Sequence, residues 1–331
     1  MNGSPLLTLA AVTAASSIAI LLVGLMRMPL RYAVGARAAY WLWLLVPATA
    51  LAMLLPVPSH SVDIVSSFQG GAATLSIFKV ALIHASSGYA APALACGWLA
   101  GVFMMLSILV HRQRAFVRSL GRLICGPDET HRSAAVAAPM VVGAWPARVV
   151  IPEDFETRYD PEERSLMLAH EQAHLSRGDA QLNVIVAGWQ CLFWFNPIVH
   201  WAAGQFRFDQ ELACDALVVA RTETARRRYA DVLLKTQLAN DATSLVPLGC
   251  HWQSNHPLKA RIAMLKRPSP TLPCRLIGIG FCVAASLLSS YTVWAVQPER
   301  TSISSLNETI AIKMKWLKQI GERKRAASGL R

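Results

Sequence analysis

Four long stretches of the chain contain no charged residue, and each is long enough to cross a lipid bilayer as a helix. They comprise residues 5–26, 38–57, 90–110 and 276–296. A hydrocarbon core of about 30 Å requires about 20 apolar residues in a helix, and only helices or closed barrels satisfy the backbone in lipid. The charged fraction, 16%, is also below the roughly 25% of soluble domains. We predict an integral membrane protein, mainly α, with four transmembrane helices.

The basic residues follow or precede these stretches in a pattern that sets the orientation. Short basic segments follow the first and third stretches and precede the fourth. They comprise Arg27, Arg31, Arg37, His111, Arg112, Arg114, Arg118, Arg122, Lys259, Arg261, Lys266, Arg267 and Arg275. Cytoplasmic connections carry an excess of Lys and Arg. Residues 5–26 lack the positive flank and cleavage site of a signal peptide, so we expect an uncleaved span with an external N-terminus.

This orientation divides the chain into parts on either side of a membrane. We expect three transmembrane helices within residues 1–110, with 58–89 as an external loop. Residues 111–275, which have mixed charge, are then a cytoplasmic domain, and 297–331 form a short external tail. The net charge of +12 follows from the basic flanks, and because no nucleic-acid-binding motif accompanies it we expect no nucleic-acid partner.

The predicted cytoplasmic domain contains an H-E-x-x-H element, His170-Glu171-Gln172-Ala173-His174. On a helix, residues four apart lie on one face, so both imidazoles can bind one ion. The preceding residues favour such a helix: Asp160 is a candidate N-cap, Pro161 and Glu163 suit the first turn, and Gly178 suits the end. Glu171 is placed to take a proton from a zinc-bound water.

A catalytic zinc needs a third protein ligand and one open position. The segment Glu211-Leu212-Ala213-Cys214-Asp215 offers two carboxylates on one helix face. We assign Glu211 to one Zn²⁺ and Asp215 to an imidazole N–H, although the two roles could be exchanged. Asp179 could similarly hold an imidazole or could be the N-cap of a helix beginning at Ala180. The 7 cysteines show no C-x-x-C spacing, which argues against a thiolate site.

The apolar run 182–206 lies between the two metal-ligand segments. A complete crossing would put the histidines and Glu211 on opposite sides of the membrane, where they could not share an ion. Asn196-Pro197 divides the run, and the part before it is too short to span. We expect a helix with a break at this dipeptide, either buried in the domain or lying in the membrane interface.

The rest of the domain provides secondary elements and candidate polar groups. Residues 141–146 and 148–152 are predicted to be two strands around a turn, either a plain hairpin or an edge for an extended substrate. Residues 222–238 are predicted to be a basic amphipathic helix. Its inward residues would be Tyr229, Val232, Leu233 and Leu234. A tetrahedral oxyanion could be stabilised by His200, Tyr229, His251 or His256, although a structural role is the more common one for each.

The whole arrangement resembles the BlaR/MecR-type membrane metallopeptidases, the membrane part of β-lactam sensor-transducers. The segments that carry the resemblance are Leu168–His174, Gly178–Asp179, Phe193–Pro197, Glu211–Asp215 and Pro257–Ile262. It implies a gluzincin-like α+β zinc metallopeptidase domain, with His170, His174 and Glu211 on zinc and Glu171 as base. It also implies an antirepressor that cleaves a cytoplasmic repressor, or itself, after an external signal.

Two features limit the resemblance and keep other functions open. Only residues 297–331 follow the last predicted span, without a penicillin-binding motif set, so we expect direct β-lactam sensing to lie outside this chain. A housekeeping protease of the HtpX or CAAX type would also pair H-E-x-x-H with E-x-x-x-D. A non-catalytic scaffold could retain zinc for structure, although such a site needs no base at Glu171.

Overall fold

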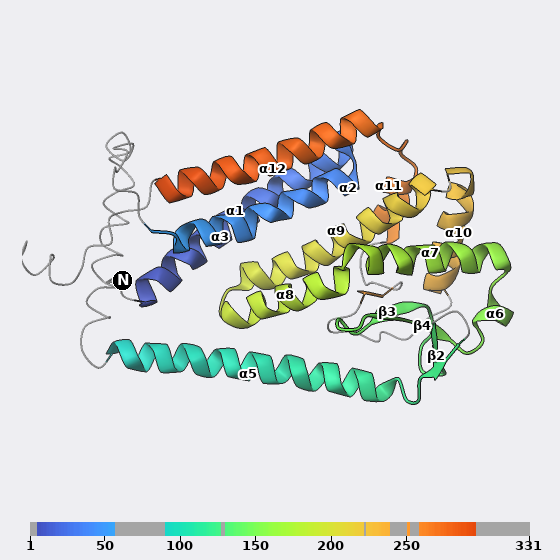
Figure 1. The fold of residues 1–331 in the computed structure, drawn as a ribbon, viewed down its shortest axis with the longest axis horizontal. Helices are drawn as coiled ribbons and strands as arrows, with labels where there is room; N and C mark the ends of the chain where they lie inside the picture. The colour runs from blue at the N-terminus through green and yellow to red at the C-terminus, as the bar shows by residue number, and fades with distance from the viewer. Residues whose placement is uncertain are drawn as a thin grey trace, which may run out of the picture.

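The structure is a computed structural model, and it describes residues 5–56, 90–126, 130–221, 223–238, 250–251 and 258–295. Helices dominate it, and one small sheet lies at one end (Figure 1). The predicted external loop and tail, the candidate His256, and most of the segment before His251 lie outside the described residues.

Four helical segments are long and apolar enough to cross a membrane, which confirms that part of the prediction. They span Thr8–Val34, Ala36–Leu54, Ala91–Ser119 and Leu272–Ala295. The corresponding elements are α1 (Pro5–Val34), α2 (Ala36–Ala39) with η1 (Tyr40–Leu44) and α3 (Leu45–Leu54), α5 (Ala90–Ser119), and α12 (Leu272–Ala295). The first helix continues beyond Met26, the predicted end of its span, to Val34. Residues outside the hydrocarbon core of a bilayer can stay helical without being apolar.

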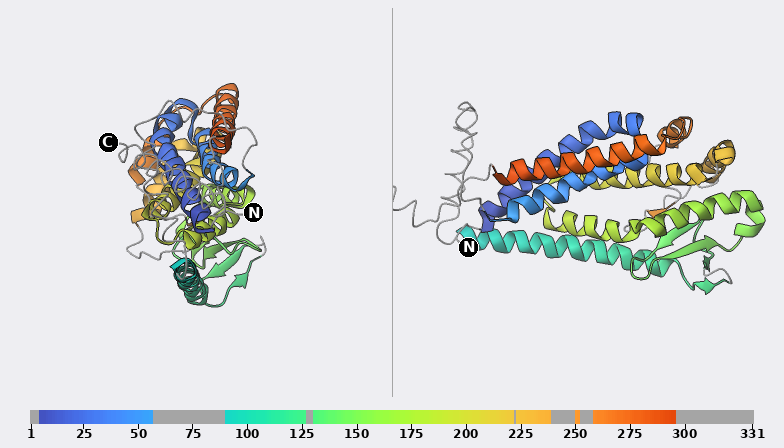
Figure 2. Two further views of the ribbon diagram at one scale, coloured as in Figure 1. Left: turned by 90° about the vertical axis from the view of Figure 1, so that its left-hand side faces the viewer. Right: turned by 45° about the horizontal axis from the view of Figure 1, so that its top comes forward.

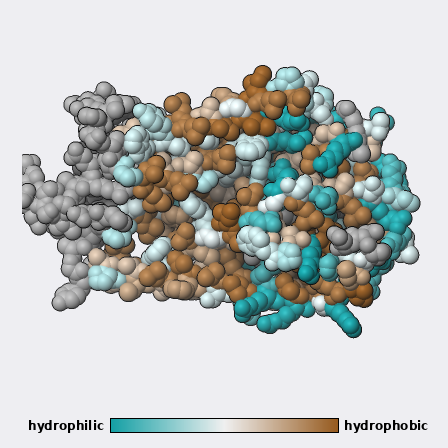
Figure 3. All heavy atoms as spheres, viewed as in Figure 1, coloured by the Kyte–Doolittle hydropathy of each residue, from teal (hydrophilic) through white to brown (hydrophobic). Residues whose placement is uncertain are grey.

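These helices lie side by side but form two groups. Helix α12 packs on α1 and α3, whereas α5 runs along the opposite side of the molecule (Figures 1 and 2). Their outward faces expose large apolar side chains such as Leu25, Phe103 and Ile277. In the space-filling view apolar atoms cover this part of the surface, and hydrophilic atoms gather at the other end (Figure 3). An exposed apolar surface of this extent indicates that these helices are surrounded by lipid.

A helical hairpin fills the space between the two groups. Helix α8 (Asp179–Leu192) and α9 (Pro197–Arg221) meet at the predicted break, where the Asn196 side chain accepts a hydrogen bond from the Ile198 N–H at 3.0 Å. At this bend Asn196 donates to Ser17 Oγ of α1, and Trp98 of α5 donates to the Leu192 carbonyl. The run 182–206 therefore turns back beside the middle of two spans, an arrangement that neither expected location described.

The sheet has the order β1-β2-β4-β3-β5 and contains the predicted hairpin. Val141 and Val149 are paired between antiparallel β3 and β4, which confirms the two expected strands. The outer edge of β3 pairs with β5. The alternative prediction, that β3 offers a free edge to an extended substrate, is therefore wrong for this structure. The strand bounds are β1 Ile124–Cys125, β2 His131–Ser133, β3 Met140–Val142, β4 Arg148–Pro152 and β5 Cys250–His251.

The core of this end of the molecule lies between the sheet and a layer of helices. Met167 of α7, Val141 of β3 and Leu233 of α10 are fully buried in it, and each such side chain contributes about 1.5–3 kcal/mol by leaving water. Leu234, expected to point inward, is 43% exposed. The helices are α6 (Phe155–Arg158), α7 (Pro161–Arg177), η3 (Glu223–Ala225), α10 (Arg226–Leu238) and α11 (Leu258–Leu265).

Candidate metal centre

Helix α7 carries the H-E-x-x-H residues and begins and ends where the sequence predicts. Asp160 accepts hydrogen bonds from the Glu162 and Glu163 N–H groups, and the Glu163 side chain accepts one from the Asp160 N–H. This reciprocal capping box satisfies donors that a helix start leaves free. Gly178 ends the helix in the left-handed conformation, at φ 67°, where glycine has no steric penalty.

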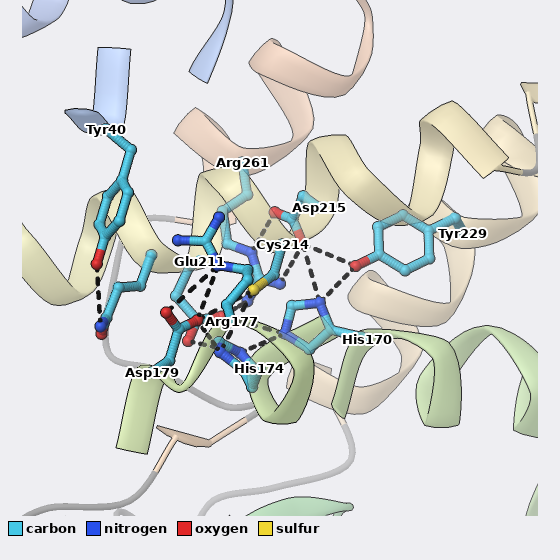
Figure 4. A network of polar contacts seen from close by, with 11 residues as sticks. Tyr40, His170, His174, Arg177, Asp179, Glu211, Cys214, Asp215, Tyr229 and Arg261 are labelled. Carbon is cyan, nitrogen blue, oxygen red and sulfur yellow. Dashed lines mark hydrogen bonds and ion pairs between the residues drawn. The ribbon is translucent and has the colours of Figure 1, made fainter. Parts of the chain in front are cut away.

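Helices α7 and α9 bring three candidate ligands to one point (Figure 4). The His170 and His174 Nε2 atoms are 3.1 Å apart, and Glu211 oxygens lie 3.4 Å from His170 Nε2 and 3.6 Å from His174 Nε2. All three side chains are at most 5% exposed. Two imidazoles and a carboxylate from different helices therefore face one small volume.

These spacings fit a zinc ion. Zinc–nitrogen and zinc–oxygen bonds of about 2.0–2.1 Å at a tetrahedral centre place neighbouring ligand atoms about 3.3 Å apart. The observed separations of 3.1, 3.4 and 3.6 Å fall on either side of that value. Three protein ligands of this type also leave the fourth position open, as in catalytic rather than structural sites.

Glu171 lies within the same buried region but is not hydrogen-bonded. Both of its carboxylate oxygens are buried without a hydrogen-bond partner among the described residues. Burial raises the pKa of Glu171 to about 7, against the opposing effect of the two imidazoles. An ionisable group held in this way is typical of a functional position, because a structural role would provide partners.

The outer nitrogen of His174 is held by a carboxylate. His174 Nδ1 and Asp179 Oδ2 are 2.8 Å apart, and Asp179 is fully buried. Gly178, not Asp179, occupies the N-cap of α8, and no side-chain cap hydrogen bond forms there. The structure thus places Asp179 beside the imidazole, the first of the two roles that the sequence left open. Such a contact fixes the imidazole tautomer and orientation.

Nδ1 of His170 is connected to Asp215 through the hydroxyl of Tyr229. The Tyr229 hydroxyl lies 2.8 Å from His170 Nδ1 and donates to Asp215 Oδ1 at 2.7 Å (Figure 4). Asp215 itself is 3.4 Å from His170 Nδ1, so Tyr229 makes the closer contact. Asp215 faces away from the His Nε2 pair that Glu211 approaches, which favours Glu211 over Asp215 as ligand. Tyr229, being engaged on both sides, positions His170.

Arg261 of α11 is a site residue that sequence reasoning missed. Its side chain is 1% exposed and donates to both Asp215 oxygens, at 2.8 and 2.7 Å. Its Nη1 also lies 3.2 Å from Glu211 Oε2, an ion pair without a hydrogen bond. Burial raises the pKa of Glu211, but Arg261 and the imidazoles outweigh it and lower the pKa to about 2. Glu211 is therefore kept as an anion.

Cys214 lies beside the candidate ligands, in contact with the groups that hold His174. Its Sγ is 3.4 Å from His174 Nδ1 and from Asp179 Oδ2. Burial raises the pKa of this thiol to about 12, so the thiol is neutral and donates to Asp179.

His200, one of the histidines considered for the oxyanion, makes its side-chain contacts away from the metal centre. His200 lies near the bend of the hairpin, where its ring contacts the Trp194 carbonyl at 2.9 Å and Gln190 at 3.2 Å. The backbone of His251 pairs with Met140 at the sheet edge. The contacts of the His200 ring and the backbone pairing of His251 could not be predicted from sequence spacing.

Comparison with known proteins agrees with this geometry. Residues 7–265 match the family described as BlaR1 peptidase M56. The Regulatory protein BlaR1 of Bacillus licheniformis is 23% identical over 184 residues, which cover 53% of this chain and 30% of that protein. The chain thus matches less than a third of that relative's length. Since the family match covers both metal-ligand segments and the first three spans, the chain belongs to the BlaR1 peptidase M56 family of metallopeptidases.

Proposed function

We propose that the chain is a zinc-dependent endopeptidase whose ion is bound by His170, His174 and Glu211. The observation that carries this proposal is the convergence of two imidazoles and one carboxylate, whose ligand atoms lie within 4.8 Å of one another, beside a second buried carboxylate with no hydrogen-bond partner among the described residues. A structural zinc would be closed by a fourth ligand and would need no base. The open position and Glu171 together favour catalysis over a scaffold.

Glu171 is the proposed general base. A zinc ion in this position would polarise the scissile carbonyl and lower the pKa of a bound water toward 7. Glu171, whose own pKa is raised by burial to about 7, accepts the proton of the attacking water and returns it to the leaving amine. Asp179 and Tyr229 keep the two imidazoles oriented through their Nδ1 atoms.

We place the catalytic part, residues 111–275, in the cytoplasm as a gluzincin-like domain, with the N-terminus, residues 58–89 and 297–331 external. The ends of α1 and α5 that follow the apolar stretches, and the start of α12, lie toward the metal centre (Figure 1). These are the ends that carry the basic residues. The positive-inside rule therefore supports a cytoplasmic site at a bacterial inner membrane.

The proposed substrate is a cytoplasmic regulatory protein, such as a transcriptional repressor, or the chain itself. Membership in the M56 family and the relative named as a regulatory protein support regulated cleavage over general degradation. The proposed signal is external, because the spans connect the site with the outer face. We also propose that it is related to the cell wall. A β-lactam is one such signal to be tested.

The test compares wild type, Glu171→Gln and the control Glu162→Gln, an exposed carboxylate on the same helix. Cytoplasmic proteins are quantified by mass spectrometry with and without a cell-wall antibiotic, and zinc is measured in purified protein. We expect Glu171→Gln to retain about one zinc per chain while a repressor stays intact, whereas Glu162→Gln behaves as wild type. Cleavage that persists in Glu171→Gln would refute the assignment. Broad accumulation of misfolded membrane proteins would indicate a housekeeping protease instead.

A further inference from the structure

An apolar cavity of about 510 Å³ lies between the first two spans and the α8–α9 hairpin. Its walls come from both sides of this boundary and consist almost entirely of apolar and aromatic side chains. They include Ile20 of α1, Trp43 of η1, Val46 of α3, Trp189 of α8, and Ala203 and Phe206 of α9. This volume is in the range of ligand-binding cavities.

The cavity opens toward the surface that would face lipid. Three of its lining residues are well exposed: Trp41 is 44%, Leu44 is 41% and Ile185 is 62% accessible. All three are large apolar side chains at the level of the candidate spans. Lipid chains, rather than water, are therefore the molecules adjacent to its mouth.

One end of the cavity is positively charged. Arg177, the last residue of α7, lines the cavity, and its guanidinium lies 4.6 Å from the Tyr40 ring centroid. Arg37 of α2 is within electrostatic range of Arg177, Arg221 and Arg275. Among the described residues Arg177 therefore lines the cavity itself, whereas Arg37 and Arg275 line a neighbouring pocket and Arg37 is within electrostatic range of Arg177.

These arginines are poorly neutralised by the protein. Arg177 binds Asp179 through Nε at 3.2 Å, and neither of its Nη groups makes a hydrogen bond or ion pair with a described residue. In the same part of the chain no side-chain hydrogen bond or ion pair engages Arg37, Arg221 or Arg275. An anion beside them would gain charge-assisted hydrogen bonds, most strongly a phosphate.

The size of the cavity decides what its apolar part can accept. A helix with its side chains is about 10 Å across, so 510 Å³ would hold only about one turn of it. A transmembrane segment of a substrate therefore does not fit. An extended hydrocarbon chain is much thinner and can lie along the cavity from its aromatic end to the hairpin bend.

We propose that an anionic phospholipid of the surrounding bilayer binds here. One acyl chain lies in the cavity, and its phosphate lies beside Arg177, within electrostatic range of Arg37. This lipid bridges the first two spans, the hairpin that carries Glu211, and the end of the helix that carries His174. The proposal is independent of the proteolytic activity, since it concerns lipid binding alone.

Native mass spectrometry of the full chain tests the proposal by counting phosphatidylglycerol and phosphatidylcholine bound after titration in detergent. We expect phosphatidylglycerol to bind about tenfold more tightly, which corresponds to one charge-assisted contact. Arg177→Gln should remove this preference, because Arg177 lines the cavity, and Arg37→Gln should weaken it. The control Arg118→Gln should keep it, because Arg118 is an equally basic position on α5, which contributes nothing to the cavity lining.

Two variants test whether the acyl chain lies in the cavity. Ala203→Phe fills the cavity and should lower the binding of both lipids about tenfold. Ile185→Trp narrows the mouth at an exposed position, so its effect does not depend on tolerance of the core to a larger side chain. Equal binding of the two lipids by wild type, or unchanged phosphatidylglycerol binding in both cavity variants, would overturn the proposal.

Discussion

At the scale of single residues, the metal centre depends on a buried network of charges as much as on its three candidate ligands. Arg261 neutralises Asp215 and faces Glu211, while Asp215 holds His170 through Tyr229. Removing one member of a buried ion pair leaves the other charged and unsolvated, which is costly. The arrangement therefore links the folding of α9, α10 and α11 to the orientation of one imidazole.

Arg261→Gln should destabilise the protein by about 3–5 kcal/mol, because Asp215 would lose its buried partner. Thermal unfolding of the purified protein in detergent measures the loss. The double variant Arg261→Gln/Asp215→Asn should recover a substantial part of it, since no unpaired charge remains. A double variant no more stable than Arg261→Gln would show that the pair is not the source of the effect.

This network also marks the limit of what could be predicted for the site. His170, His174 and Glu211 could be selected because metal chemistry requires their residue types and helical spacing places them on one face. Arg261 lies 46 residues from Asp215, and no periodic pattern connects the two. An arginine among other basic residues is also typical of a cytoplasmic flank. The burial of Arg261 could therefore be learned only from the tertiary structure.

At the scale of elements, α7 shows how local rules place the histidines. The N-cap, the proline at the first position and the final glycine act within a few residues, so they could be predicted directly. The α8–α9 hairpin was predictable only in its break at Asn196-Pro197. Its position between α1 and α5 depends on contacts such as Asn196 with Ser17, 179 residues away.

The capping carboxylate should give α7 a specific pH dependence. Hydrogen bonds from Glu163 and Glu162 N–H groups, and Arg228, lower the pKa of Asp160 below its ordinary 3.8. Its stabilisation is therefore complete above about pH 3.8 and is lost as pH falls through the lowered value. Asp160→Asn keeps a capping side chain without the charge. We expect wild type to unfold at higher temperature than this variant at pH 7, and the difference to shrink as the pH falls below about 3.8. A constant difference would contradict the capping role.

Asp209 should secure α9 to the first span. It pairs with Arg31 and lies 3.5 Å from Arg27, and it accepts a hydrogen bond from Trp43 at 2.8 Å. Asp209→Asn would leave buried arginine charge beside the hairpin, with an expected loss of about 3–5 kcal/mol. Chemical unfolding in micelles measures it, and Asp209→Asn/Arg31→Gln should be more stable than the single variant. If both variants unfold like wild type, α9 is held to α1 by apolar packing alone.

At the scale of the whole molecule, apolar and basic segments alternate so that the proposed catalytic part lies beyond one end of the helical spans. The number of spans could be predicted because uncharged runs of this length have few alternatives in water. The grouping of α12 with α1 and α3, and the separate position of α5, could not, because apolar helices offer similar surfaces to one another. Orientation across the membrane follows from charge, which makes it directly testable.

Cys125 provides the test of orientation, because it is exposed in β1 of the proposed cytoplasmic part. A variant that keeps Cys125 as the only cysteine is treated with a membrane-impermeant maleimide in right-side-out and inverted vesicles. We expect labelling only in inverted vesicles, since the basic flanks hold this part inside. The matched variant Cys125→Ser/Ser66→Cys moves the thiol to the proposed external loop and should label only in right-side-out vesicles. Labelling of Cys125 from outside would place the metal centre on the external face, where a cytoplasmic repressor could not be its substrate.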